Sequence, residues 1–372
     1  MELADHFLDR QAFCEHHDWI FRNYRTTLPV GKSFEPLYFK GDKDKCCFEV
    51  LPDGRINNSY FIGVDWLITG KKAVYVEPKV NTAGQQLAYL QMLFSALQHA
   101  ELLEHSTELF EIKWKDPAVP ISQQQDLLTP LLVVQFLQAV KNIVHKGLKK
   151  SYYRVQQTLS GRVKGKILVA ETLKHSHSKG RYLQTHCSFD VFGVDGKENR
   201  LLKKALVFVQ RYLPSHKNLN GERFFQETFQ YVMPAFEGVS ETVSLEEVTT
   251  LVTNPFYKEY KLAIYLAKLI LRRFGYAVNN ASAQQVTTPP FWIDMSKLFE
   301  LYVLGLLKDR YPHTGAITYH PSTYGNELDF LINVDGLQMV ADAKYKLKYQ
   351  SNNPNHDDIR QVSGYSRLKV VY

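Results

Sequence analysis

The sequence is poor in cysteine and has no long hydrophobic run. Its four cysteines among 372 residues show no Cys-x-x-Cys spacing, so neither a disulfide framework nor a common zinc site is indicated. No apolar run approaches the length of a membrane span, and the first ten residues, MELADHFLDR, lack the features of a signal peptide. We therefore expect a protein of the reducing cytoplasm that makes no contact with a membrane.

Two common catalytic motifs are also missing. LPVGKS ends like a phosphate-binding loop, but Thr26 stands where the first glycine of that loop belongs. No Gly-x-Ser-x-Gly elbow occurs, which argues against an α/β-hydrolase. The chain therefore has no nucleotide hydrolysis site of its own, and any GTP or ATP hydrolysis must come from a partner.

What is present is a large apolar content and an uneven distribution of charge. With 45% hydrophobic and 13% aromatic residues, the chain can bury substantial cores, and its length suits two or three domains. The net charge of +7 is concentrated in residues 140–211, which hold sixteen Lys/Arg against four Asp/Glu. Such a basic segment meets phosphates or an acidic partner, unless it is only a solvated surface.

The order of patterns predicts a mixed α/β (α+β) protein. Alternating strands fill the first eighty residues, and a hairpin is expected around Ser160-Gly161. Helical periodicity marks the segments 85–103, 124–148, 197–213, 224–236, 255–274 and 292–309. The polar, proline-terminated stretch 279–290 predicts a linker. Two regions follow: residues 1–290, with possible subdomains, and residues 291–372, with a mixed sheet flanked by helices.

The C-terminal region carries the strongest chemical signal. Residues 326–346, NELDFLINVDGLQMVADAKYK, read as two strands joined by an Asp335-Gly336 turn. The first strand offers Asp329 and the second offers Asp342 and Lys344, which share one face because side chains alternate along a strand. Two carboxylates and a lysine at one end of a sheet indicate a divalent-metal site for phosphodiester hydrolysis, whereas an Asp-x-Lys alone is usually a surface pair.

Neighbouring helices add three polar side chains to this constellation. Glu300 lies among apolar residues at core-facing spacing, where a lone buried carboxylate would be costly without a partner. Gln361 and Tyr365 are spaced i, i+4 and so lie on one helix face, where they could touch DNA or simply reflect helix amphipathicity. Mg²⁺, which takes hard oxygen ligands and keeps several waters, suits such a site.

The order Glu, Asp, Asp-x-Lys and Gln-x-x-x-Tyr resembles the PD-(D/E)XK nuclease superfamily in its RecB-like branch. More narrowly, DMSKLFELYV, ELDFLI, VADAKYK and QVSGYSR are similar to motifs of the McrC family. The segments YFIGVDWL, VYVEPK, GRVKGKILVAETLK and ENRLLKKAL agree with the same family. The resemblance covers about Tyr60 to Tyr365.

This resemblance implies an endonuclease of a modification-dependent (5-methylcytosine) restriction system. Residues 291–372 would be the endonuclease domain, and residues 1–290 would dock on McrB, a hexameric AAA+ GTPase, and stimulate it. Asp329 and Asp342 would bind Mg²⁺, with Lys344 and Glu300 also catalytic and Gln361 and Tyr365 on the substrate side. The substrate would be methylated double-stranded DNA, and GTP would be bound by the partner.

Other interpretations stay open at this point. Arg162, Lys164 and Lys166 alternate in GRVKGKI, so a strand would project all three from one face, toward the GTPase, toward DNA or only into solvent. The chain could also be a stand-alone RecB-like repair nuclease or a non-catalytic adaptor of an AAA+ ring. Residues 368–372 resemble the start of a buried strand, so the nuclease region is expected to be truncated.

Overall fold

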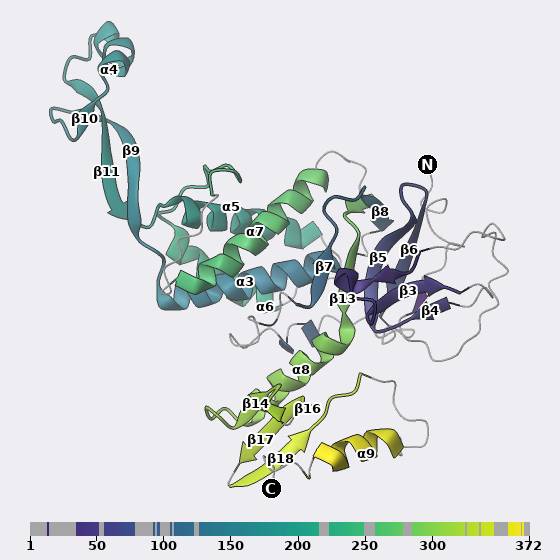
Figure 1. Cartoon of the computed structure of the whole chain (residues 1–372). Helices are drawn as coiled ribbons and strands as arrows, with labels where there is room; N and C mark the ends of the chain where they lie inside the picture. The colour runs from purple at the N-terminus through teal and green to yellow at the C-terminus, as the bar shows by residue number, and fades with distance from the viewer. Residues whose placement is uncertain are drawn as a thin grey trace. The chain divides into compact units, whose positions relative to one another are not determined.

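Strands and helices alternate through the whole of the chain that the computed structural model describes (Figure 1). Those residues are 13–14, 35–51, 56–78, 92–93, 95–96, 105, 108–122, 126–215, 223–248, 257–277, 285–323, 326–334, 336–345, 356–365 and 367. The predicted mixed α/β architecture is confirmed. Among these residues, no helix combines the length and the apolar character needed to cross a membrane.

The chain divides into two compact units, and neither is one of the two predicted regions. The first unit joins residues 1–138 to residues 272–372, and the second comprises residues 139–271. The boundary expected near Pro290 does not coincide with this division, because the strand that begins at Phe291 belongs to a sheet of N-terminal strands. The assignment of residues 1–290 to docking and residues 291–372 to cleavage stays a prediction.

The main sheet of the first unit has five strands in the order β1-β6-β5-β13-β7. Their bounds are β1 Phe13–Cys14, β5 Phe61–Ile68, β6 Lys72–Glu77, β7 Phe110–Ile112 and β13 Phe291–Asp294. The first six residues of β5 are all buried, as expected of a strand with both faces covered. Phe48, Phe61, Val74 and Trp292 belong to the core that packs on this sheet.

β13 enters this sheet between β5 and β7 through an unusually close backbone approach. A Cβ atom on Gly63 would lie 2.1 Å from the carbonyl oxygen of Phe291, so only glycine allows this pairing. The buried Asp65 carboxylate accepts hydrogen bonds from Trp292 Nε1 at 2.8 Å and from Lys113 Nζ at 2.6 Å. These contacts anchor β13, although some 220 residues of chain separate it from β5.

Smaller sheets flank the five-stranded one. β2 (Leu37–Tyr38), β3 (Cys46–Val50) and β4 (Ile56–Asn58) form one sheet in that order. β8 (Val119–Ser122) pairs antiparallel with β12 (Gln285–Thr288). The predicted linker 279–290 is therefore wrong for its second half, because the backbone of β12 forms sheet hydrogen bonds with β8.

A buried ion pair joins the two segments of the first unit, close to the points where the chain passes into the second unit and comes back from it. Arg273 Nη2 lies 2.5 Å from Asp126 Oδ1, and both side chains are almost fully buried. Arg273 also donates to Thr129 and Thr288, so its guanidinium is well satisfied. Asp126 accepts the Thr129 N–H at 3.1 Å, in the first turn of α3 (Leu128–Lys146).

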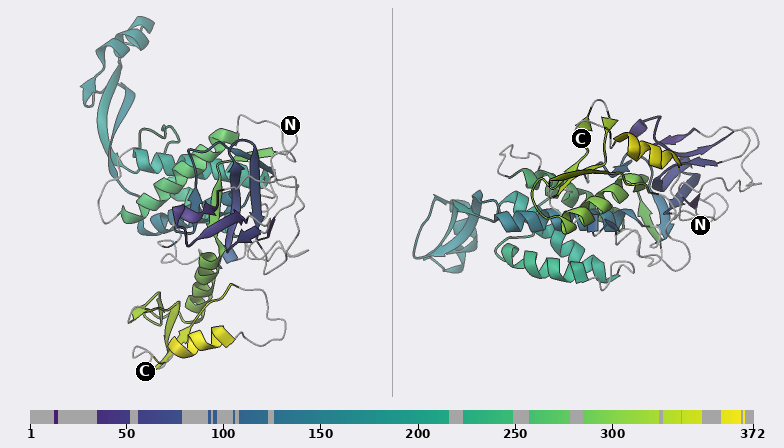
Figure 2. Two further views of the ribbon diagram at one scale, coloured as in Figure 1. Left: turned by 45° about the vertical axis from the view of Figure 1, so that its right-hand side comes forward. Right: turned by 90° about the horizontal axis from the view of Figure 1, so that it is seen from below.

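A long antiparallel ribbon dominates the second unit (Figure 2). β9 (Ser151–Ser160) pairs with β11 (Gln184–Gly193) over ten residue pairs, and α4 (Val169–His175) lies at its far end. The predicted hairpin around Ser160-Gly161 is wrong, because β10 (Lys166–Ile167) pairs with β11 and not with β9. Strand-like composition did not reveal this more distant partner.

Helices form the rest of the second unit and hold the base of the ribbon. They are α5 Lys197–Tyr212, α6 Arg223–Val232 and α7 Lys258–Ala277, with α3 and α7 crossing into the first unit. The buried Asn199 on α5 donates through Nδ2 to the Lys149 carbonyl at 2.9 Å and to the Val194 carbonyl at 2.6 Å. One side chain thus ties the segment before β9 to the segment after β11.

The C-terminal part of the first unit contains the predicted strand pair. β17 (Phe330–Val334) and β18 (Leu337–Ala341) are antiparallel, with Gly336 at φ 78° in the turn, and β14 (Ile317–Tyr319) completes the sheet. α8 (Met295–Arg310) precedes this sheet and α9 (His356–Tyr365) follows it. The predicted strand at 368–372 and most of the predicted helix at 85–103 lie outside the described residues.

The remaining short elements are β15 Ser322–Thr323, which pairs with β16 Asn326–Glu327, and the 3₁₀ turns Phe39–Gly41, His177–Lys179, Leu213–Ser215 and Met233–Phe236.

The approach of β5 to β13 makes Gly63→Ala strongly destabilising. The added methyl group would force the Phe291 carbonyl away, which we expect to lower the free energy of unfolding by about 3 kcal/mol. Urea denaturation followed by fluorescence measures this change. Gly238→Ala is the matched control, since a Cβ there meets nothing within 4 Å. Equal stability of the two variants would contradict the close approach.

Candidate functional site

The two aspartates of the C-terminal motif lie at one end of the β17–β18 pair. Asp329 directly precedes β17 and Asp342 directly follows β18, and Phe330 is paired with Ala341 between them. The antiparallel register therefore brings the aspartates together from 13 positions apart in the chain. The Ala343 N–H donates to Asp329 Oδ2 at 2.7 Å, which fixes one carboxylate against the segment that carries the other.

Lys344 lies against Asp342 in the same segment. Its Nζ is 3.0 Å from Asp342 Oδ2, and the aspartate side chain is only 2% exposed. Because β18 ends at Ala341, both residues lie just past the strand rather than on its face as predicted. Burial lowers the pKa of Lys344, but its bond to Asp342 and the nearby negative groups outweigh this, so the pKa is raised and the ammonium stays charged.

The surroundings of Asp329 disfavour its charged form. Burial is the largest cause, and the charges of Asp342 and Glu300 act in the same direction, while the Ala343 hydrogen bond and Lys344 oppose them. Together they raise the pKa of Asp329 to about 6. A cation between these carboxylates would reverse the shift, as expected of a site that holds positive charge.

The donor set at this end of the sheet fits a hard divalent cation. Asp342 Oδ1 is buried and has no hydrogen-bond partner, although buried carboxylate oxygens are rarely left unpaired. In the described part of the chain, no group of three or more carboxylate, histidine or cysteine side chains is close enough to hold a metal. Asp329 and Asp342 would therefore share a cation with water, which suits Mg²⁺.

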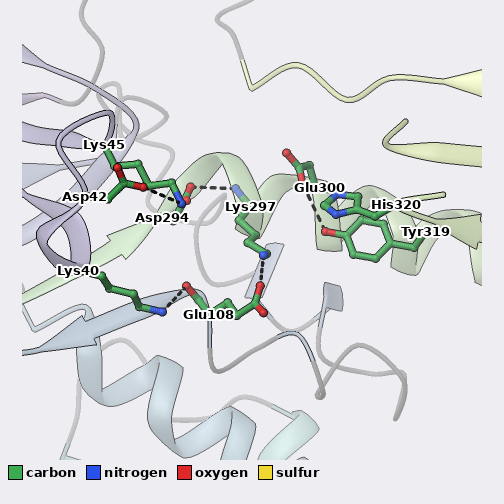
Figure 3. A network of polar contacts seen from close by, with 9 residues as sticks. All are labelled: Lys40, Asp42, Lys45, Glu108, Asp294, Lys297, Glu300, Tyr319 and His320. Atoms are coloured by element: carbon green, nitrogen blue, oxygen red, sulfur yellow. Dashed lines mark hydrogen bonds and ion pairs between the residues drawn. The ribbon is translucent and has the colours of Figure 1, made fainter. Parts of the chain in front are cut away.

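Glu300, on α8, is linked to two side chains that the sequence analysis did not select (Figure 3). Its Oε2 accepts from Tyr319 Oη at 3.3 Å and lies 3.3 Å from His320 Nε2. Burial, followed by the charge of Glu300, raises the pKa of Tyr319, so its phenol stays a donor. The only sequence signal was the His320-Pro321 pair, which does not indicate chemistry by itself.

The start of α8 is fixed by contacts with N-terminal segments. Asp294 caps the helix by accepting the Lys297 N–H at 3.0 Å, and Lys297 in turn forms an ion pair with Glu108 (Figure 3). The Met295 N–H donates to the Tyr60 carbonyl at 2.9 Å. Burial raises the pKa of Asp294. The helix that carries Glu300 therefore begins at a fixed point of the five-stranded sheet.

An aromatic contact joins α8 to the segment that carries Lys344. Tyr345 is buried, and its ring centroid lies 5.6 Å from that of Phe299 and 6.5 Å from that of Tyr60. Tyr345, which follows Lys344, thus packs on Phe299, which precedes Glu300. This packing holds the lysine and the glutamate on facing elements of the same unit.

Gln361 and Tyr365 on α9 contact each other as their spacing predicts. Gln361 Nε2 donates to Tyr365 Oη at 2.8 Å. α9 contacts β18, the strand that leads to Asp342, and the charge of Tyr365 acts to raise the pKa of Lys344. The structure thus groups Asp329, Asp342 and Lys344, and the charges of Glu300 and Tyr365 act on this group.

The three cations of the basic segment lie elsewhere, at the ribbon of the second unit. Arg162, Lys164 and Lys166 are all exposed, but only Lys166 belongs to a strand. The prediction that they share one strand face is wrong, because Gly165, at φ 68°, breaks the extended conformation. Lys164 Nζ lies 4.3 Å from the centroid of the Phe189 ring, in a cation–π contact.

Comparison with known protein families gives a match over most of the chain. The family of McrBC 5-methylcytosine restriction system components matches residues 61–369. No match was found among curated proteins.

Two solved structures from Thermococcus gammatolerans are also similar. The first is a refined half-complex from a tetradecameric assembly of McrB AAA+ hexamers with bound McrC, with 17% identity and a TM-score of 0.37 over 87% of this chain and 71% of that chain. The second is the McrBC complex determined by cryo-electron microscopy, with 16% identity and a TM-score of 0.31 over 72% of this chain and 70% of that chain.

The raised pKa of Asp329 predicts that Asp329→Asn stabilises the metal-free protein. Below about pH 4 the carboxyl is neutral in both folded and unfolded states, so the substitution has no electrostatic effect. Between about pH 4 and pH 6 the unfolded carboxyl ionises while the folded one keeps its proton, so the penalty on the folded state grows over this range. Above about pH 6 the penalty is complete, and Asp329→Asn should stabilise by on the order of 1 kcal/mol after allowance for solvent screening. The asparagine can still accept the Ala343 N–H.

Urea denaturation in EDTA at about pH 4.5 and pH 7.5 tests this prediction. Asp44→Asn, at an exposed aspartate in a turn, is the control for loss of a surface carboxylate. Destabilisation by Asp329→Asn of equal size at both pH values would contradict it.

Proposed function

Because the chain belongs to the family of McrBC 5-methylcytosine restriction system components, as its motifs predicted, we propose that it is the nuclease subunit of such a system. The reaction would be Mg²⁺-dependent hydrolysis of phosphodiester bonds in double-stranded DNA that carries modified cytosine. The observation that carries the proposal is the buried Asp342 carboxylate beside Asp329. One of its oxygens forms an ion pair with Lys344, and the other has no hydrogen-bond partner.

Each residue of the acidic site has a role that its surroundings support. Asp329 and Asp342 would hold Mg²⁺, which when bound lowers the pKa of water and neutralises developing charge. Lys344, kept protonated by Asp342, would place a positive charge beside the scissile phosphate. Glu300 would orient water at the edge of the site.

The substrate would approach past α9. Gln361 and Tyr365 lie on one face of this helix, and Tyr365 is close enough to influence Lys344. An amide and a phenol are suited to hydrogen bonds with phosphate and sugar oxygens, which position a duplex without reading its sequence. Recognition of the modified base would then belong to another component of the system.

We further propose that the ribbon of the second unit meets the partner GTPase. Arg162, Lys164 and Lys166 are accompanied at the same end by large exposed apolar side chains, among them Val163 at 56%, Tyr182 at 73% and Leu183 at 75% exposure. Apolar and basic side chains together favour a protein interface over a phosphate backbone, which attracts mainly cations. The partner would be an McrB-like hexameric AAA+ GTPase, which would bind and hydrolyse the GTP.

Cleavage of methylated and unmethylated plasmid tests the nuclease proposal. We expect wild-type protein to cut methylated plasmid when Mg²⁺, the partner and GTP are present, and Asp342→Ala to lose at least about a hundredfold in rate, since even outer-shell groups contribute 10–100-fold. Asp44→Ala is the control for loss of an exposed aspartate. Cleavage without partner or GTP would instead favour a stand-alone nuclease. Stimulated GTP turnover without any cleavage would favour a non-catalytic adaptor.

Reversal of the ribbon charges tests the partner contact separately. We expect the triple variant Arg162→Glu, Lys164→Glu and Lys166→Glu to stimulate the partner's GTP turnover at least about tenfold less than wild type does. Its acidic side chains would repel the surface of the partner that binds the basic ones. Lys43→Glu, Lys71→Glu and Lys115→Glu combined, at three exposed turn lysines of the first unit, control for the same change in net charge. Unchanged stimulation, together with weaker retention of DNA on a filter, would assign the ribbon to DNA instead.

A further inference from the structure

His320 connects the two sides of the acidic site through two different groups. Its side-chain Nε2 lies 3.3 Å from Glu300 Oε2, and its backbone N–H donates to the carbonyl oxygen of Asp329 at 3.1 Å. Glu300 comes from α8 and Asp329 from the start of β17. One residue therefore links the glutamate of the helix to the backbone of the aspartate on the sheet.

Tyr319 provides the second contact to the same glutamate oxygen. It ends β14, where its register partner is Phe330, the residue after Asp329. Its ring stacks on the Phe330 ring at 5.8 Å and on the His320 ring at 3.9 Å between centroids. Because β14 is hydrogen-bonded to β17, the Tyr319 hydroxyl has a fixed position relative to Asp329.

The backbone of His320 adopts a conformation that is favourable for glycine and unfavourable for histidine. Its φ is 49°, in the left-handed region, and a proline follows it, which favours an extended conformation instead. A non-glycine residue held there is energetically costly, and such residues are typical of functional sites. Glycine would remove this cost, so the histidine side chain is retained at the expense of stability.

We propose that Tyr319 and His320 are positioning residues that hold the Glu300 carboxylate toward the Asp329–Asp342 site. The inference rests on the nuclease proposal and deepens it. Both contacts occupy Oε2, and among the described residues Oε1 of Glu300 has no hydrogen-bond partner. Glu300 is also one of the charges that raise the pKa of Asp329, so the fixed carboxylate lies within electrostatic reach of that aspartate.

The consequence is a third carboxylate with a defined orientation outside the pair of aspartates. A glutamate that were free to rotate would spend much of its time in water, and its help in ordering water around a cation would be small. Outer-shell groups that orient the inner ones contribute roughly 10–100-fold to metal affinity or activity. Tyr319 and His320 would act on Mg²⁺ only through Glu300.

Mg²⁺ binding measured by calorimetry on the whole chain, without partner or DNA, tests the inference. We expect Tyr319→Phe and His320→Gly each to weaken Mg²⁺ binding roughly tenfold. Glu300→Gln should have a similar effect, and combining it with His320→Gly should weaken binding little further, since the histidine acts through the glutamate. His313→Ala, an exposed histidine before the same strand, is the control.

Urea denaturation of the same variants separates positioning from structural support. His320→Gly should unfold at the same or a higher urea concentration than wild type, because it relieves the positive φ. His320→Asn, which tolerates this φ but is too short to reach Glu300, provides a second variant should the glycine variant fail to fold. Unchanged Mg²⁺ affinity in Tyr319→Phe and in His320→Gly or His320→Asn would overturn the inference.

Asp342→Ala distinguishes this failure from failure of the nuclease proposal. If Asp342→Ala abolishes Mg²⁺ binding and the Tyr319 and His320 variants do not alter it, only the positioning role is wrong. If Asp342→Ala binds Mg²⁺ and cleaves as wild type does, the nuclease site itself is wrong and the positioning role with it.

Discussion

The insertion of β13 between β5 and β7 is the constraint on which the candidate site depends. Gly63 admits the Phe291 carbonyl, and Asp65 receives Trp292, so a strand from late in the chain is held in a sheet of early ones. α8 begins one residue after that strand, with Asp294 as its cap. The position of Glu300 therefore follows from a contact between backbones made far from it in sequence.

The acidic site differs from the sheet, because several of its local features destabilise the folded state. Asp342 buries an oxygen without a partner, Asp329 has a raised pKa, and His320 has a positive φ. Each feature lowers stability in the absence of a ligand, and the proposed cation beside the aspartates would offset the first two. The apolar core that packs on the five-stranded sheet supplies stability that offsets them.

Sequence reasoning succeeded where neighbours in the chain decide the structure. The strand pair around Gly336 was correctly predicted, and so were α5 and the contact between Gln361 and Tyr365, because turn chemistry and helical spacing are local signals. It failed for β9, whose true partner lies beyond a short helix, and for β12, whose polar composition suggested a linker. It also missed Tyr319 and His320, since only the pairing of β14 with β17 brings them to Glu300.

The anchoring of both strands of the β9–β11 ribbon at its base by Asn199 has a mechanical consequence. Ten residue pairs give the ribbon a length of roughly 30 Å. Because the segments before β9 and after β11 are tied to one side chain, a pull on its far end stretches both backbones equally. The hydrogen bonds between the strands then carry almost no shear. A force applied to the far end of the ribbon would therefore be passed to α5 through both strands together.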